Sequence, residues 1–207
     1  MLNYTMVSKS LILKELPFHI SLAHKLWADF LSPEDTAIDA TCGNGHDAAF
    51  LAPLISALSV YDIQESALKN TKNKLTDSAC QINFNLRSHT DFIEKTANLI
   101  IYNLGYLPSG NKEITTQTTS TIVSVEKALS ILAPKGAISI TCYPGHTEGK
   151  KEETAVVKLA NNLDPNLWKA YWHKQINNPI APSLLWIEKI KNQENGKFLH
   201  SPKNSLN

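Results

Sequence analysis

The sequence predicts an α/β fold, namely a doubly wound, mostly parallel sheet of seven strands that ends in an antiparallel hairpin. Three observations support this prediction. Apolar runs of strand length alternate with helically spaced apolar residues almost to the end of the 207 residues. Residues 97–104 are mainly apolar, as expected of a central strand that is covered on both faces. Near the end of the chain, two strand-like segments follow one another without a helix between them.

The first predicted element is a helix over residues 18–31, because apolar side chains recur there at helical spacing. This face consists of Ile20, Ala23, His24, Trp27 and Leu31. The next elements are strand 36–41, helix 47–55, strand 58–62, a helix through 67–75, strand 82–87, strand 97–104 and helix 116–132. A turn at 134–136 leads to strand 137–143, helix 151–162 and the final strands 168–176 and 184–190. We expect residues 1–191 to form a single domain and 192–207, which are poor in apolar residues, to form a flexible tail.

The composition excludes several classes of protein. With 43% hydrophobic and 19% charged residues, the chain can bury a full core, so it is neither disordered nor fibrous. Twenty Lys and Arg against 19 Asp and Glu leave a net charge of +1, so any contact with RNA depends on a local patch. No apolar run approaches the ~20 residues of a membrane span. Three cysteines suit neither a disulfide framework nor a zinc site, and no histidine pair has metal-ligand spacing, so we expect a cytoplasmic protein without a metal.

Six of the eight glycines follow three of the predicted strands, which marks one edge of the sheet as the expected ligand site. They are Gly43, Gly45, Gly105, Gly110, Gly145 and Gly149. Glycine is also common in ordinary turns, which is the plainer explanation of the same pattern.

The loop after the first strand is acidic at both ends. It reads Asp39-Ala-Thr-Cys-Gly-Asn-Gly-His-Asp47, and Asp62 ends the next strand. Its glycines fit the dinucleotide pattern G-x-G-x-x-G/A, but Asp39 and Asp47 would repel a pyrophosphate. S-Adenosylmethionine carries an ammonium and a sulfonium against one carboxylate, so the acidic loop favours it. We expect Asp39 near the methionyl ammonium and Asp62 on the ribose hydroxyls, whereas Asp47 has a plain helix-start acid as its alternative.

The fourth predicted strand ends in Asn103-Leu-Gly-Tyr106. An amine that is to be methylated must point its lone pair at the methyl group. The side-chain oxygen of Asn103 and the carbonyl of Leu104 can accept both N–H bonds of such an amine, and Tyr106 can stack on a base. The tetrapeptide resembles the N-P-P-Y box of amino-methyltransferases, with Leu-Gly in place of Pro-Pro.

Further candidates follow the third and fifth strands. His146, at the end of Tyr143-Pro-Gly-His146, could accept a proton from a substrate ammonium. Glu152 could bind a cationic amine, and His89 could flank an adenine. The alternatives are a surface histidine, a helix-start acid and a residue that only completes a turn.

In this order, these segments resemble the MnmM/YtqB-like methyltransferases, which have a Rossmann-like class I methyltransferase fold. The resemblance covers roughly residues 17–190 and rests on 39–47, 61–64, 103–108 with Lys112, 143–146 with 152–153, 175–179 and 187–189. It implies methylation of the amine of 5-aminomethyl-2-thiouridine at the tRNA wobble position, with S-adenosylmethionine as cofactor and the anticodon region of tRNA as partner. Ser109, Asn111 and the separated Pro179 and Pro182 depart from the family pattern on the substrate side.

The residues and the resemblance together define the expected site. Cofactor contacts are expected at Asp39, Thr41, Gly43, Asn44, Gly45, Asp47, Asp62, Gln64, His89, Asn103 and Leu104. Catalytic roles are expected for Asn103, Tyr106 and His146. Substrate contacts are expected at Tyr106, Lys112, Tyr143, His146 and Glu152.

The expected reaction is direct attack of a deprotonated amine on the methyl group, without a covalent enzyme intermediate, because an amine is already nucleophilic. Phosphates of the tRNA could be gathered by Lys112, Lys150, Lys151 and Lys174. The exposed final hairpin could form the edge of a homodimer. The alternatives are methylation of rRNA or of a small amine, and a Rossmann-type module that binds a nucleotide without catalysis.

Overall fold

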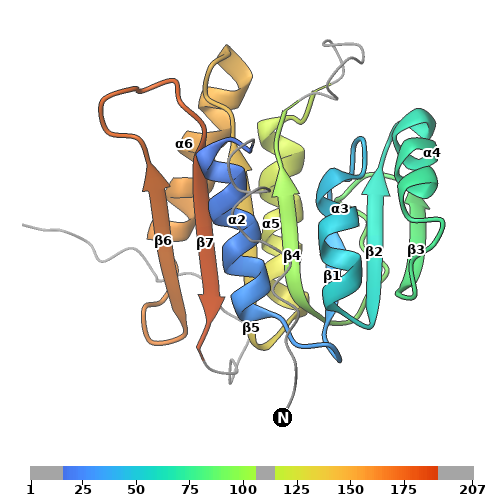
Figure 1. The fold of residues 1–207 in the computed structure, drawn as a ribbon. Helices are drawn as coiled ribbons and strands as arrows, with labels where there is room; N and C mark the ends of the chain where they lie inside the picture. Colours follow the sequence, from blue (N-terminus) through green and yellow to red (C-terminus); the bar gives the residue numbers. More distant parts are fainter. Residues whose placement is uncertain (1–15, 106–114, 191–207) are drawn as a thin grey trace, which may run out of the picture.

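A computed structural model describes residues 16–105 and 115–190 of the chain (Figure 1). The helices in these ranges are α2 (Phe18–Phe30), α3 (His46–Leu51), the 3-10 helix η1 (Ala52–Leu54), α4 (Glu65–Lys74), α5 (Thr118–Ile131) and α6 (Thr147–Asn161). The strands are β1 (Thr36–Asp39), β2 (Ala57–Asp62), β3 (Gln81–Leu86), β4 (Ala97–Asn103), β5 (Leu132–Cys142), β6 (Trp168–Lys174) and β7 (Ser183–Lys189). The predicted tail, 192–207, lies outside the described residues.

The strands form a seven-stranded sheet in the order β3-β2-β1-β4-β5-β7-β6. Neighbours from β3 to β5 are parallel, whereas β7 runs antiparallel to both β5 and β6. The predicted fold class is therefore confirmed. The strand order reverses between β1 and β4, and a doubly wound sheet binds its ligands at the carboxyl ends of the strands beside such a reversal.

Helices cover both faces of this sheet. In Figure 1, α2 and α3 lie in front of the sheet, and α5 and α6 lie behind it. Side chains of β4 alternate between the two layers, because Leu99 and Ile101 join the core beneath α2 and α3 while Ile100 joins the other core. This double burial explains why the centre of β4 is apolar on both faces.

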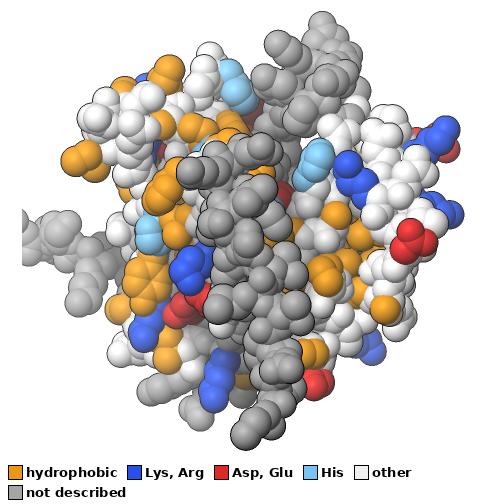
Figure 2. Space-filling model, viewed as in Figure 1, with side chains coloured by type: hydrophobic (Ala, Val, Ile, Leu, Met, Phe, Trp, Pro, Cys, Tyr) orange, Lys and Arg blue, Asp and Glu red, His pale blue; other side chains and the backbone are white. Residues whose placement is uncertain are grey.

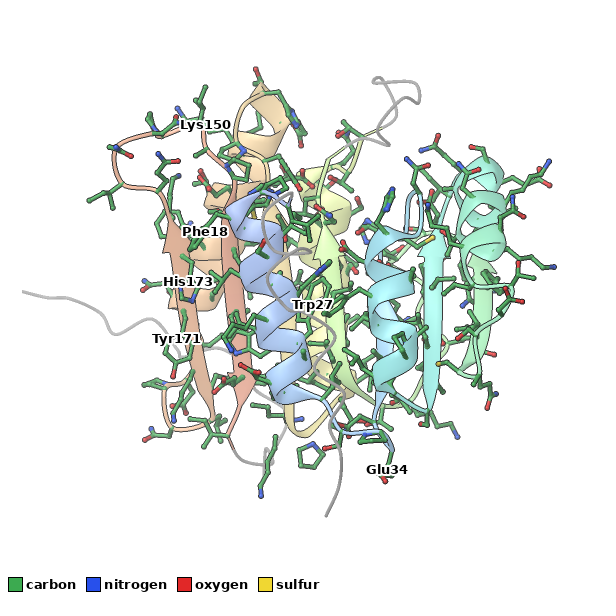
Figure 3. All side chains as sticks on the ribbon, viewed as in Figure 1. Phe18, Trp27, Glu34, Lys150, Tyr171 and His173 are labelled. Atoms are coloured by element: carbon green, nitrogen blue, oxygen red, sulfur yellow. The ribbon has the colours of Figure 1, made fainter. Side chains whose placement is uncertain are left out.

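Helix α2 precedes the alternation of strands and helices and packs against α3. Its buried side consists of Ala23, His24 and Trp27. The rings of His24 and Trp27 lie 3.9 and 6.1 Å from the ring of Phe50 on α3, measured between centroids. Figure 3 shows Phe18, which is 80% exposed, at the upper end of α2. No helix in the described part of the chain is long and apolar enough to cross a membrane.

Several predicted boundaries are wrong for local reasons. Helix α6 begins at Thr147 instead of 151, because the side chain of His146 accepts a hydrogen bond from the backbone of Gly149 and caps the helix. Strand β5 begins at Leu132 and continues through the predicted turn at 134–136, where Lys135 has a φ of 61° and the pairing with β4 shifts register. The predicted helix 47–55 is divided into α3 and η1, and β1 ends at Asp39 instead of 41.

Candidate active site

A cavity of about 750 Å³ lies at the carboxyl ends of β1, β2, β4 and β5, a volume typical of small-molecule and cofactor sites. It is lined by most of the predicted site residues: Thr41, Gly43, Asn44, Asp47, Asp62, Gln64, His89, Asn103, Leu104, Tyr143 and His146. Asp39, Gly45 and Glu152 are not among the lining residues, and Tyr106 and Lys112 lie outside the described part of the chain. We call the ends of β1, β2 and β3 the cofactor side. The ends of β4 and β5 with the starts of α3 and α6 are the substrate side.

Asp62 on the cofactor side is held by two backbone amides. The N–H of Gly43 donates to Oδ2 at 3.0 Å, and the N–H of Gln64 donates to Oδ1 at 2.9 Å. Burial raises the pKa of this carboxyl, and the two hydrogen bonds oppose the rise. Each oxygen keeps a further lone pair that can accept a hydrogen bond from a ligand hydroxyl.

Asp39 lies at the end of β1 and is only 1% exposed, so its place near the methionyl ammonium, which the sequence predicts, stays a prediction. Its Oδ1 accepts a hydrogen bond from the N–H of Thr41 at 3.2 Å, and its buried Oδ2 has no hydrogen-bond partner among the described residues. Burial, together with the nearby Asp47 and Asp62, raises the pKa of Asp39 well above its ordinary value. A positive charge in the adjoining cavity would lower that pKa again, so this carboxylate favours a cationic ligand.

Gly45 does not line the cavity, and it serves the packing of α3 and its preceding loop against α4. It precedes α3 with a φ of 74°, and a Cβ at this position would lie 2.7 Å from the Cα of Thr71 on α4. Only glycine permits this backbone conformation together with so close an approach of a neighbouring helix. Thr71 also donates from its hydroxyl to the carbonyl of Gly43 at 3.1 Å, which fixes the loop against α4.

His89 is a neutral side chain on the cofactor side. Burial lowers its pKa to about 4, and its Nδ1 has no hydrogen-bond partner within the described ranges. The ring makes an edge contact with Tyr102, with 6.1 Å between centroids. A neutral ring with an unused nitrogen is suited to lie beside a heteroaromatic base.

Asn103 is fixed at the end of β4 by bonds from both its backbone and its side chain. Its N–H donates to Oγ1 of Thr41 at 2.7 Å, which ties the ends of β1 and β4 together. Its side-chain Nδ2 donates to Oδ2 of Asp47 at 3.1 Å. The N–H of Leu104 donates to the carbonyl of Thr141 on β5 at 2.9 Å, so the end of β4 is held by strands on both sides.

His146 lines the cavity, and its Nδ1, which the predicted role of proton acceptor would use, already has a hydrogen bond. Its Nδ1 accepts the N–H of Gly149 at 3.1 Å, so the proton of the neutral ring is on Nε2. Nε2 is then a donor, and the ring cannot accept a second proton without losing the helix cap. Tyr143 lies nearby with its hydroxyl 3.3 Å from Nε2 of His19, and burial raises the pKa of Tyr143 to about 12.

Glu152 is 1% exposed, so the predicted substrate contact is wrong. Its carboxylate accepts hydrogen bonds from the hydroxyls of Thr116 at 2.9 Å and Thr121 at 2.7 Å. Oγ1 of Thr116 in turn accepts the N–H of Gly105 at 2.8 Å. Because Thr116 and Gly105 both line the cavity, Glu152 acts on the wall of the site without touching a ligand.

Sequence analysis missed several residues that line the cavity: Arg87, Thr115, Thr116, Gln117 and Ile180. Arg87 is the only arginine of the chain and directly follows β3, which was a usable signal. The others come from segments with no motif. The described residues contain no group of three His, Cys, Asp or Glu side chains placed to hold a metal ion.

The lysines predicted to gather phosphate differ in their surroundings. Lys174 pairs with Glu153 at 2.6 Å and its side chain is 21% exposed, so the prediction that it gathers phosphate is corrected. Lys150 is exposed and lies at the upper edge of the view in Figure 3, where β2 and β4 have their carboxyl ends. Lysine and arginine side chains are spread over the face shown in Figure 2, with acidic side chains between them.

The sequence of the chain is similar to a protein family and to a curated tRNA methyltransferase. The profile of the family described as "Putative rRNA methylase" matches residues 58–189. The chain is 33% identical over 190 residues to the tRNA (mnm(5)s(2)U34)-methyltransferase, chloroplastic, of Arabidopsis thaliana, which corresponds to 83% of this chain and 69% of that protein.

Solved structures are similar over most of the chain. A crystal structure described as a "putative rRNA-methylase" from Clostridium thermocellum is 33% identical, with a TM-score of 0.80, over 84% of this chain and 99% of that one. A protein from Streptococcus mutans described as "a putative methyltransferase", in complex with SAH, is 31% identical, with a TM-score of 0.75, over 84% of this chain and 99% of that one. With more than half of the sequence matched by the family profile, the chain belongs to this family of methyltransferases.

Proposed function

We propose that the protein is an S-adenosylmethionine-dependent N-methyltransferase that acts on tRNA. Its acceptor is the 5-aminomethyl group of a wobble 5-aminomethyl-2-thiouridine, and its product is the 5-methylaminomethyl nucleoside. One observation carries the proposal: a single cavity is lined by Asp62 at the end of β2 and Asn103 at the end of β4. The name of the Arabidopsis relative supports tRNA as the substrate, and the SAH complex of the Streptococcus mutans relative supports the methyl donor.

The cofactor side suits S-adenosylmethionine, which supplies a methyl group on a positively charged sulfur when bound. Asp62 would accept the ribose hydroxyls through its remaining lone pairs. The neutral ring of His89 would lie against the adenine. The unpartnered Oδ2 of Asp39 favours a cationic ligand over a diphosphate.

The substrate side would hold the amine. Oδ1 of Asn103 and the carbonyl of Leu104 accept its two N–H bonds, which directs its lone pair toward the cofactor side. As the new N–C bond forms, the C–S bond breaks and the sulfur keeps the electron pair. Orientation alone can lower the activation barrier by about 7–11 kcal/mol in well-oriented cases. Orientation of the amine by Asn103 and Leu104 is therefore the main contribution of the chain to the rate.

The proton of the substrate ammonium must leave before attack. Nδ1 of His146 already accepts the N–H of Gly149, so we do not assign that proton to His146. Tyr143 and His19, 3.3 Å apart, form the pair that we place on the route of the proton. Burial lowers the pKa of His19 and the nearby Asp47 opposes this shift, so the neutral ring, which has a nitrogen able to accept a proton, is favoured.

The remaining parts of the proposal concern partner, compartment and assembly. We place the anticodon region of tRNA over the edge that carries Lys150. The cytoplasm is the proposed compartment because Cys42, Cys80 and Cys142 are free thiols. The name of the Arabidopsis relative places that protein in the chloroplast. A homodimer would use the outer edge of β6, the last strand of the sheet.

The test is methyl transfer from labelled S-adenosylmethionine to tRNA that carries 5-aminomethyl-2-thiouridine, followed by nucleoside mass spectrometry. We expect the 5-methylaminomethyl nucleoside and no other labelled product. Matched tRNA with an unmodified wobble uridine is the control and should gain no label. Label in rRNA fractions, with none in the wobble nucleoside, would contradict the proposal and favour the rRNA alternative.

A further inference from the structure

We propose that His24 and Asp47 are positioning residues for methyl transfer, because they fix the side-chain amide of Asn103 with its oxygen toward the methyl acceptor. This inference rests on the proposed function, since it concerns the oxygen that would accept the N–H of the substrate amine. It assigns to α2, a helix outside the alternation of strands and helices, a direct part in the geometry of the reaction.

Asp47 uses both carboxylate oxygens on the protein itself. Oδ1 accepts a hydrogen bond from Nε2 of His24 at 2.8 Å, and Oδ2 accepts one from Nδ2 of Asn103 at 3.1 Å. An ionised carboxylate can only accept hydrogen bonds, so the nitrogen of the Asn103 amide must be the atom that faces it. The amide oxygen is thereby left for the cavity that Asn103 lines.

His24 is held so that its Nε2 cannot leave Asp47 easily. It is 9% exposed and stacks on Phe50 with 3.9 Å between ring centroids and 15° between the ring planes. Trp27 covers it from a second direction at 5.0 Å and 46°. The side chains of His24 and Asp47 are 11% and 13% exposed, so few competing water molecules reach their hydrogen bond.

The backbone of Asn103 is fixed independently of its amide. Its N–H donates to Oγ1 of Thr41 at 2.7 Å, so the side chain starts from a constant position. Without Asp47, rotation of the amide would exchange oxygen for nitrogen, and two donors would face an N–H of the substrate. The bonds from Asp47 and His24 therefore select the productive orientation over the one that repels the amine.

This role makes a different prediction from the cofactor contact expected for Asp47 from the sequence. A cofactor contact would weaken binding of S-adenosylhomocysteine when it is removed. A positioning role would lower kcat and leave that affinity nearly unchanged. The two roles are therefore separable with the same variants.

The first experiment uses Asp47→Asn, which keeps the size of the side chain but offers one acceptor and one donor. Asn103 can then bond through either end of its amide, so the productive orientation is no longer selected. We expect kcat to fall roughly 100-fold, as small misplacements of a reacting group can do, while calorimetry finds unchanged affinity for S-adenosylhomocysteine. An unchanged kcat, or an affinity that falls as much as kcat, would overturn the proposal.

The second experiment compares two variants of His24 with a packing control. His24→Leu removes the donor to Asp47, whereas His24→Gln supplies an amide donor and should recover part of kcat. Trp27→Phe disturbs the same aromatic cluster but leaves the hydrogen bond in place. We expect a lower Tm with little loss of kcat for this control. Equal losses of kcat in Trp27→Phe and His24→Leu, or no recovery of kcat in His24→Gln, would show a merely structural role.

A third measurement is independent of activity. The side-chain 15N–1H signals of Asn103 report whether Nδ2 donates to a carboxylate. We expect one proton shifted downfield in the wild type and the shift lost in Asp47→Asn, and in His24→Leu where that variant folds. Unchanged signals would overturn the proposal. A wild type that shows these signals but does not methylate the tRNA would contradict the proposed function instead.

Discussion

The two sides of the cavity use their acidic residues differently. On the cofactor side, the carboxylate of Asp62 accepts hydrogen bonds from backbone N–H groups, among them those of Gly43 and Gln64, and it keeps lone pairs for a ligand. On the substrate side, Glu152 is bonded by two threonine hydroxyls and Asp47 by His24 and Asn103. Carboxylates of the first kind can bind a ligand directly, whereas those of the second kind hold the residues that would bind it.

The largest effect should come from the residue on which the substrate side depends. Asn103→Ala removes the amide oxygen that would accept the amine, so we expect kcat to fall by roughly 100-fold or more. The backbone bond to Thr41 does not need the side chain, so binding of S-adenosylhomocysteine should stay nearly unchanged. Calorimetry and the methyl-transfer assay measure the two quantities. Equal losses in both would remove the distinction between the two sides.

Gly149 tests the packing of the substrate side. A Cβ at this position would lie 2.1 Å from the carbonyl oxygen of Tyr143 and 2.8 Å from Nε2 of His146. We expect Gly149→Ala to lower the free energy of unfolding by about 1–3 kcal/mol, as overpacking does, and to lower methyl transfer. Gly145→Ala is the matched control, because its nearest contact would be 3.8 Å away. Equal stability of both variants in urea denaturation would refute the close approach.

Substitution of Asp62 tests the cofactor side, and it should lower cofactor affinity instead of kcat, the reverse of Asn103→Ala. Asp62→Asn removes the charge and one acceptor, so we expect affinity for S-adenosylhomocysteine to fall roughly 10-fold. At saturating S-adenosylmethionine, kcat should change little. Asp91→Asn, an exposed site close to β3, controls for the loss of charge and should behave as the wild type. A fall in kcat without a fall in affinity would place Asp62 on the substrate side.

His89 gives the cofactor side a pH dependence. Its folded pKa of about 4 lies below the ordinary value of 6.5, so the unfolded chain binds more protons between these values. The contribution of His89 to the free energy of unfolding is therefore complete above pH 6.5 and is lost as the pH falls toward 4. As the pH falls across this range, the free energy of unfolding of His89→Asn, measured by denaturation, should decrease less than that of the wild type. His173→Asn, an exposed histidine on β6, should not differ from the wild type.

The smallest effect concerns the lysines near the substrate side. Binding of tRNA through phosphates should weaken with salt, and Lys150→Ala should reduce the slope of log affinity against log salt by about one. Lys174→Ala should leave that slope unchanged and lower Tm, because Lys174 is bonded to the buried Glu153. Identical slopes for the wild type and Lys150→Ala would exclude a phosphate contact at Lys150.

The fold could be predicted from the sequence because the central strands, β4 above all, are mostly apolar on the faces that they bury. The predicted ends of elements were wrong where a single side chain or the local backbone geometry determines them. Examples are the start of α6, which His146 caps, and the start of β5, where Lys135 has a positive φ. Strand ends predicted most of the cavity, since the carboxyl ends of parallel strands meet at one edge. The apolar periodicity of a helix does not distinguish a buried histidine that only packs from one that also donates a hydrogen bond.

His24 shows what sequence alone leaves out of the site. It lies among the helically spaced residues of α2 and was interpreted as part of the buried face. Its bond to Asp47 spans 23 residues, and the bond from Asp47 to Asn103 spans 56. Likewise, Glu152 follows His146 closely in the chain but faces threonines in the core. The packing of distant elements determines which carboxylate lone pairs accept a hydrogen bond from the protein itself. A local sequence pattern does not contain this information.

The most direct test of the account is a crystal structure with S-adenosylhomocysteine. We predict that the ribose hydroxyls bond to the carboxylate of Asp62 and the adenine lies beside His89. The sulfur should lie on the side of the cavity that faces Asn103. A dinucleotide that binds there in its place, or S-adenosylhomocysteine bound away from the ends of β1 and β2, would contradict the central claim.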